Sequence, residues 1–269
     1  MNNYICSTCG VQYDATEDNP LECKICMDDR QYVPSTGQKW TTLHNLKQDG
    51  YTNEFVEVEP NLIAIKTKPQ VGIGQTAYLM KTPEGNVLWD CITYIDEDTV
   101  QRIQDMGGLK AIAISHPHYY SAICEWAEIF NCPIYIHESD QEWTTRKSDH
   151  YVFWKEKSLR INSSIELINL GGHFKGSSVL LWKSDTNPEG VLLVGDTILM
   201  VPDSGWVSFM YSYPNRIPLS PNVIKNIRGM IIKYEFNRLY DAFGKSILED
   251  GKGSVIKSAD RYLKYIEIE

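Results

Sequence analysis

Short apolar runs, broken by glycine, proline and polar residues, recur along the chain from about residue 54 onwards. Runs of this length, rich in valine, isoleucine and leucine, are typical of buried β-strands. The turn residues at 83–85 join two of the runs into a hairpin. The pattern predicts strands at 62–65, 76–80, 86–90, 111–114, 133–136, 164–170, 178–182 and 191–194.

Helical segments are predicted between these runs and after them, at 42–48, 96–106, 121–131, 221–234 and 259–266. The second of them has a capping aspartate at Asp96 or Asp98, and the glycine pair at 107–108 ends it. A hairpin followed by strand–helix alternation predicts a layered α/β or α+β domain. Periodicity alone does not choose between these two topologies.

Composition adds size and charge to this picture. The chain has 269 residues, of which 42% are hydrophobic, so we expect one large domain with a small appendage. Its net charge of −9 argues against nucleic acids and anionic membranes, because these are bound through clustered lysine and arginine. No apolar stretch approaches the roughly 18 residues of a membrane span, and the N-terminus lacks the pattern of a secretory signal. We therefore expect a cytoplasmic protein; the sequence leaves its oligomeric state open.

Four of the seven cysteines lie in the first 26 residues, as the pairs Cys6/Cys9 and Cys23/Cys26. Disulfides are disfavoured in a reducing compartment, and two C-x2-C turns can close a tetrahedral S4 site around a metal ion. The run Tyr4–Gly10 resembles the first knuckle of rubredoxins, but zinc ribbons tolerate the short insert between these pairs better. The prediction is a metal knuckle at 1–35, a linker at 36–53 and the main domain at 54–269, with zinc favoured and iron as the alternative.

Histidines stand where predicted strands end. His116 and His118 follow the run 111–114, His173 follows another apolar segment, and Asp196 follows the run 191–194. Strand ends are where sites tend to lie in α/β sheets. Three neutral imidazoles and a carboxylate suit a catalytic zinc with one position open for water, whose pKa then falls to about 7.

These motifs, taken in order, resemble the metallo-β-lactamase superfamily over about residues 54–250. The segment from Ser115 to His118 resembles the start of its H-x-H-x-D-H signature, the glycines before His173 its second metal motif, and the segment around Asp196 its bridging-aspartate motif. Asp90, which follows an apolar strand, resembles an aspartate of the family that lies next to the metal ligands without binding the metal itself. The resemblance implies a four-layer αβ/βα sandwich with the site at one edge.

Two departures from the family pattern concern its second metal. Tyr120 and Ser121 stand where the signature has its Asp and last His, and residues 240–244 hold no histidine. The resemblance therefore implies a single metal in this domain, held by His116, His118 and His173. Zinc is favoured there, iron or manganese stay open, and Asp196 is either the fourth ligand or the hydrogen-bond partner of the water.

The functional hypothesis is a mononuclear zinc hydrolase that acts on a small ester, thioester, lactone or amide through metal-bound hydroxide. Asp196 would orient or deprotonate the water, and Tyr119 or Tyr120 would donate to the developing oxyanion. The aromatic stretch 198–218 either lines the pocket, packs in the core or forms a subunit contact. The alternatives are an iron-binding redox protein and a catalytically impaired binding module.

Overall fold

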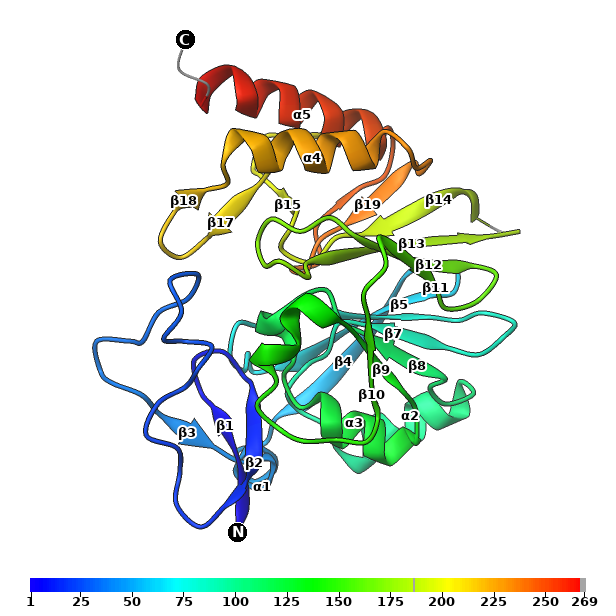
Figure 1. Cartoon of the computed structure of the whole chain (residues 1–269). Coiled ribbons are helices and arrows are strands. Elements are labelled where there is room, and N and C mark those ends of the chain that lie inside the picture. The colour runs from blue at the N-terminus through cyan, green and yellow to red at the C-terminus, as the bar shows by residue number, and fades with distance from the viewer. Residues whose placement is uncertain (186, 267–269) are drawn as a thin grey trace.

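Two β-sheets face each other between two layers of helices (Figure 1). The computed structural model describes residues 1–185 and 187–266. The first sheet has seven strands in the order β10-β9-β8-β7-β6-β5-β4. Its strands are β4 (Thr52–Glu59), β5 (Leu62–Lys68), β6 (Ala77–Met80), β7 (Val87–Trp89), β8 (Ala111–Ala113), β9 (Ile134–His137) and β10 (Tyr151–Trp154). The predicted four-layer αβ/βα sandwich is confirmed.

The second sheet has six strands in the order β11-β12-β13-β14-β19-β20. They are β11 (Ser158–Arg160), β12 (Ile165–Asn169), β13 (Ser178–Ser184), β14 (Asn187–Leu193), β19 (Arg238–Tyr240) and β20 (Ser246–Ile247). Both sheets mix antiparallel hairpins with parallel pairs, which are β7–β8, β8–β9 and β9–β10 in one and β14–β19 in the other. Parallel strands buried on both faces carry continuous apolar runs, which is why the sequence pattern locates β8 and β9 so clearly.

Three apolar layers hold the sandwich together. Trp89 and Trp182 are fully buried between the two sheets, and Ile103 and Trp126 pack the first sheet against its helices. Ile227 belongs to the third layer, between the second sheet and the C-terminal helices. Burying a large apolar side chain is worth about 1.5–3 kcal/mol, so these layers dominate the stability of the fold.

The helices cover the outer faces of the sheets. α2 (Glu97–Asp105) and α3 (Ile123–Phe130) lie below the first sheet, and α4 (Pro221–Ile231) and α5 (Gly251–Ile266) lie above the second (Figure 1). Asp96 caps α2 as expected, since its side chain accepts from the Thr99 amide at 2.8 Å. In the described part of the chain, no helix combines the length and the apolar character that crossing a bilayer requires.

The last helix corrects the sequence prediction, because it begins eight residues before the predicted start at residue 259. Its first turn contains Gly251 and Gly253, which disfavour a helix by roughly 1 kcal/mol each. A β-carbon on Gly251 would lie 2.8 Å from the Asn237 carbonyl oxygen. The helix therefore starts with a small residue because it starts against the backbone next to β19.

The N-terminal residues form a unit that packs on the main domain. Its three-stranded sheet has the order β2-β1-β3 and contains β1 (Asn2–Cys6), β2 (Gln12–Thr16) and β3 (Trp40–Thr41), followed by α1 (Leu43–Gln48). Its cysteines, Val11 and Ile25 share one apolar cluster with the first sheet and α3, and Ile5 and Leu46 pack in a second cluster with Val71 and Tyr94. The segment predicted as a linker, 36–53, thus contributes a strand to the knuckle and carries the predicted helix. The domain boundaries themselves stay a prediction.

Short segments between the second sheet and α4 make two small ribbons. They are β15 (Leu199–Met200) with β16 (Val207–Ser208), and β17 (Met210–Ser212) with β18 (Ile217–Pro218). Two short helices of 3-10 type span Pro117–Tyr119 and Glu138–Trp143. The first carries the predicted ligand His118, and the ribbon β17–β18 lies over the same edge of the sandwich.

Candidate metal centres

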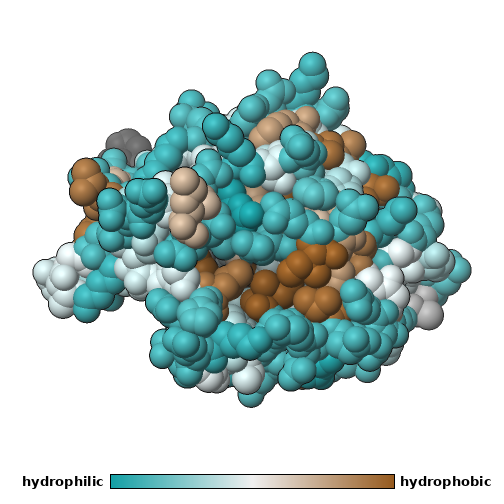
Figure 2. Space-filling model, turned by 90° about the horizontal axis from the view of Figure 1, so that it is seen from below, coloured by the Kyte–Doolittle hydropathy of each residue, from teal (hydrophilic) through white to brown (hydrophobic). Residues whose placement is uncertain are grey.

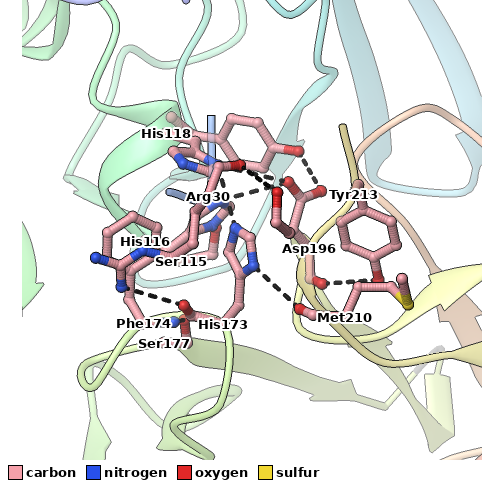
Figure 3. Close-up of polar contacts among 12 residues, drawn as sticks. Arg30, Ser115, His116, His118, His173, Phe174, Ser177, Asp196, Met210 and Tyr213 are labelled. Atoms are coloured by element: carbon pink, nitrogen blue, oxygen red, sulfur yellow. Dashed lines mark hydrogen bonds and ion pairs between the residues drawn. The ribbon is translucent and has the colours of Figure 1, made fainter. Parts of the chain in front are cut away.

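Three histidines and an aspartate from both sheets converge at one edge of the sandwich (Figure 3). His116 and His118 follow β8, His173 lies in the loop between β12 and β13, and Asp196 follows β14. Their ligand atoms all lie within 4.8 Å of one another, and each residue is at most 5% exposed. The structure thus brings together the four residues that the sequence predicts as ligands.

The atoms that face the centre of the group are defined by close contacts. Asp196 Oδ2 lies 3.5 Å from His116 Nε2 and 3.9 Å from His118 Nδ1. His173 Nε2 lies 3.1 Å from His118 Nδ1. His116 Nε2 is buried and has no hydrogen-bond partner. Three ring nitrogens and one carboxylate oxygen lie within 4.8 Å of one another, and one of them has no partner, so they form a donor set suited to a cation.

The protonation of the group favours a cation over protons. Burial lowers the pKa of His118 to about 4 and lowers the pKa of His173 well below its usual value. For Asp196 burial acts to raise the pKa, but the close imidazoles of His116 and His118 outweigh it and hold the pKa below the ordinary range. Metal ligands must be deprotonated, and at neutral pH the side chains of His118, His173 and Asp196 already are.

Neighbouring polar groups set the orientation of the imidazoles. Ser115 Oγ lies 2.8 Å from His116 Nδ1, and the Ser115 amide donates to Asp90 Oδ1 at 2.7 Å. His173 Nδ1 lies 3.2 Å from the Met210 carbonyl oxygen. Burial raises the pKa of Asp90 to about 8. Asp90 thus supports His116 through Ser115, in the place behind the ligands that the sequence predicts for it.

Two tyrosines hold Asp196. The Tyr119 hydroxyl donates to Asp196 Oδ1 at 2.5 Å, and the Tyr213 hydroxyl donates to the Asp196 carbonyl oxygen at 3.1 Å. The Tyr120 hydroxyl donates instead to the Asp140 carbonyl oxygen at 2.9 Å. The site therefore includes Tyr119, whose hydrogen bond orients a ligand, whereas the hydroxyl of Tyr120 is engaged outside the ligand group. The catalytic roles predicted for both tyrosines stay predictions.

A glycine allows the two sheet ends to approach each other. Gly195, just before Asp196, has φ +53°, and a β-carbon there would lie 2.5 Å from Ser115 Oγ. A side chain at this position would displace Ser115 from His116. The glycine of the Gly195-Asp196-Thr197 motif is thus required by the close packing of the two ligand-bearing segments.

The four N-terminal cysteines form the second group. The Sγ atoms of Cys6 and Cys26 lie 3.5 Å apart, those of Cys9 and Cys23 lie 3.6 Å apart, and all four residues are buried. Zinc–sulfur bonds of about 2.3 Å place the sulfurs of a tetrahedral site about 3.8 Å apart. The Gln38 amide donates to Cys6 Sγ at 3.1 Å. The cysteine group therefore fits a tetrahedral metal ion with little adjustment.

Comparison with known proteins identifies the lineage. No protein-family model matches the chain. The uncharacterized protein YmaE of Bacillus subtilis (strain 168) is 49% identical over 270 residues, which cover 100% of this chain and 98% of that protein. The chain belongs to the YmaE family.

Solved structures establish the fold of this YmaE-family protein. A B3 metallo-β-lactamase with an active-site glutamic acid covers 83% of the chain and 93% of its own length, with 16% identity and a TM-score of 0.55. The metallo-β-lactamase DIM-1 covers 78% and 98%, with 14% identity and a TM-score of 0.59. The chain has the metallo-β-lactamase fold with an added N-terminal cysteine knuckle, as the sequence motifs indicate.

Ser121, one of the positions at which the chain departs from the metallo-β-lactamase signature, takes part in the packing of the fold. Ser121 Oγ accepts from the Gln75 side-chain amide at 2.7 Å and donates to the Cys91 carbonyl oxygen at 3.2 Å. Ser121 is thus part of a buried hydrogen-bond network. Within residues 1–185 and 187–266, the His/Asp group and the cysteine group are the two clusters suited to a metal.

Arg30 is a site residue that the sequence did not reveal. It lies shortly after the last cysteine of the knuckle, yet its Nη1 donates to the His173 carbonyl oxygen at 3.3 Å (Figure 3). Its guanidinium carbon lies 3.6 Å from the centre of the Phe174 ring, and that ring packs against all three histidines. No local pattern predicts a contact that spans 143 residues of sequence.

An apolar groove of about 540 Å³ lies elsewhere, between α1, α2 and α3. Its apolar lining includes Leu43, Ile95, Val100 and Ile129. Figure 2 shows an apolar strip in a hollow of the underside of the molecule. None of the residues that line the groove belongs to either metal-binding group, so it is separate from the candidate centres.

Proposed function

We propose that this chain is a metal-dependent hydrolase that acts on a small ester, thioester, lactone or amide, with one zinc ion at the His/Asp group. The observation that carries the proposal is the convergence of four buried ligand atoms from both sheets, one of them a ring nitrogen without a partner. Three protein ligands with a fourth position open to water are typical of catalytic zinc sites. When bound, zinc supplies a Lewis acid that polarises a carbonyl oxygen and acidifies water.

The protein contributes orientation to this chemistry. Ser115 and the Met210 carbonyl hold the rings of His116 and His173, and Tyr119 holds Oδ1 of Asp196. This leaves Asp196 Oδ2 directed at the imidazoles, where it would either ligate a zinc ion or accept a hydrogen bond from the attacking water. Partners behind the ligands typically change metal affinity or activity by about 10- to 100-fold.

The surroundings of the group favour a small substrate. Phe174 and Tyr213 pack around His173, with ring centres 5.2 and 6.1 Å from the imidazole. Aromatic walls with few polar groups suit small ligands. With a net charge of −9, the chain is a poor partner for nucleic acids or anionic membranes.

We further propose that the cysteine group binds a second, structural zinc ion and that the protein works in the cytoplasm. All seven cysteines are free, and the four of the knuckle are arranged as one tetrahedral donor set. A reducing compartment keeps such thiols available for a metal. An iron ion at the cysteines would colour the protein, so a visible absorption spectrum separates the zinc hydrolase from the iron-binding redox alternative.

The test is a hydrolase panel of p-nitrophenyl esters, thioesters, lactones and amides, run on the native protein, after chelation and after zinc is restored. We expect hydrolysis of at least one class, its loss on chelation and its return with zinc. His118→Ala should abolish the activity, whereas His44→Ala should not, because His44 is exposed and lies outside the group. Activity that survives in the His118→Ala protein would contradict the proposal. Zinc bound at the His/Asp group without hydrolysis would indicate a binding module.

A further inference from the structure

Residues 28–31, called here the connecting segment, run directly from the cysteine group to the His/Asp group. The turn that contains Cys26 continues into the segment, because the Met27 amide donates to the Cys23 carbonyl at 3.0 Å and the Asp28 amide to the Ile25 carbonyl at 3.4 Å. The Gln31 amide then donates to the Asp28 carbonyl at 2.9 Å. The position of the segment therefore depends on the geometry of the cysteine turn.

Arg30 is the side chain that reaches the other centre. Both carboxylate oxygens of Asp28 accept from it, at 2.5 Å from Nε and 2.8 Å from Nη2. This pair leaves Nη1 to donate to the His173 carbonyl oxygen, while the guanidinium stacks on Phe174. The Arg30 side chain is only 12% exposed. A charge-assisted pair of this kind holds the guanidinium in one orientation.

The backbone of the connecting segment is attached to the ribbon β17–β18. Ser212 Oγ donates to the Arg30 carbonyl at 3.2 Å, and the Asn215 side-chain amide donates to the carbonyls of Asp29 and Gln31 at 2.9 and 3.1 Å. The same ribbon supplies the Met210 carbonyl to His173. The segment thus contacts the His173 loop through the Arg30 side chain, and its backbone contacts the ribbon that carries Met210.

We infer that the connecting segment couples the two metal centres, with Arg30 as the positioning residue through which the knuckle acts on His173. The inference rests on the proposed zinc sites. Metal binding supplies folding energy to small cysteine units, so the knuckle metal fixes the turn at Cys26 and with it Arg30. Loss of that metal loosens the segment, the His173 loop and the Met210 carbonyl together, and the His/Asp group then releases its own metal faster.

The experiment measures how fast the chromogenic chelator 4-(2-pyridylazo)resorcinol extracts zinc from the His/Asp group of the full-length, zinc-loaded protein. Arg30→Ala should speed extraction about tenfold, since a lost charged hydrogen bond is worth about 1.5 kcal/mol, and Arg30→Lys should restore part of the effect. Cys9→Ser, which removes a knuckle ligand outside the connecting segment, should speed it at least as much. The double variant should be no faster than the faster single variant, because both changes act through one route.

Arg146→Ala is the matched control. The Arg146 side chain is 14% exposed, and it also contacts the knuckle by donating to Gln12 Oε1 at 2.7 Å, but it makes no contact with the ligands. Its extraction rate should stay within about twofold of the parent protein. Effects of Arg30→Ala and Cys9→Ser that multiply in the double variant, or an unchanged rate in Cys9→Ser, would overturn the coupling.

A second readout separates failure of the coupling from failure of the proposed function. If His173→Ala leaves the zinc content unchanged, the His/Asp group is not the zinc site and the proposed function fails. Amide hydrogen exchange still reports on the coupling in that case. We expect faster exchange at residues 172–178 and 210–215 in Cys9→Ser than in Arg146→Ala. Equal exchange in these two variants would overturn the inference whatever the metal content.

Discussion

Replacing Tyr119 by phenylalanine removes one hydroxyl from behind a proposed metal ligand. That hydroxyl donates to Asp196 Oδ1 at 2.5 Å, in a position where Tyr119 is fully buried and Asp196 is 5% exposed. Without it, a carboxylate oxygen stays buried with no replacement donor from water. A lost hydrogen bond to a charged group costs about 1.5–3 kcal/mol, so we expect the metal-free variant to be less stable by about that amount.

The effect on metal binding follows from the same contact. Asp196 without its Tyr119 partner can rotate away from the imidazoles, so zinc affinity at the His/Asp group should fall by about 10- to 100-fold. Urea denaturation of the metal-free protein measures the first effect. Competition with a zinc chelator of known affinity measures the second.

Tyr120→Phe is the internal control for Tyr119→Phe. Tyr120 is the next residue and is equally buried, but its hydroxyl donates to the neutral Asp140 carbonyl at 2.9 Å. Its loss should cost about 1 kcal/mol and leave zinc affinity within about twofold of the parent protein. If Tyr119→Phe and Tyr120→Phe bind zinc equally well, the reasoning that Tyr119 positions a ligand is wrong.

Two further predictions concern Asp90, which lies behind the His/Asp group, and Gly72, which packs against the knuckle. Burial raises the pKa of Asp90 to about 8, above the unfolded value near 3.9, so its stabilising contribution is complete below pH 4 and is lost as pH rises through 8. In metal-free protein, the parent should therefore lose unfolding free energy between pH 5 and pH 8, and Asp90→Asn should lose about 2–4 kcal/mol less over the same range. An equal loss in both proteins would refute this. Gly72 has φ +59°, and a β-carbon there would lie 2.6 Å from the Gly10 backbone nitrogen of the knuckle. Gly72→Ala should cost about 3 kcal/mol in thermal or urea unfolding, and Gly50→Ala, at φ +77° in open space, about 1 kcal/mol; equal costs would argue against a tight contact at Gly72.

The sequence predicts the sandwich well where strands are buried on both faces. β8 and β9 carry continuous apolar runs, and α2 has both its capping aspartate and its terminal glycines. β4 is harder to recognise, because it lies at the edge of its sheet and five of its eight residues are polar or charged. The start of α5 was not predicted because Gly251 and Gly253 disfavour a helix. Gly251 is nevertheless helical there, because it packs against the backbone beside β19.

The candidate site was likewise predicted only in part. The ligands were predictable because each follows an apolar strand, and strand ends converge at one edge of a layered fold. The contacts that orient them were not, because they join distant parts of the chain. Arg30 and Met210 both reach His173, from 143 residues before it and 37 residues after it, and no periodicity or motif links these positions. Similarly, the motif containing Tyr119 and Tyr120 does not show which hydroxyl turns toward Asp196.

Zinc content per chain, measured by elemental analysis of the parent protein and two single variants, tests the central claim most directly. The two ligand groups predict two zinc ions in the parent protein. His173→Ala should lose the zinc of the His/Asp group and keep that of the knuckle, while Cys9→Ser loses the knuckle zinc. A His173→Ala protein that is folded and holds as much zinc as its parent would contradict the account.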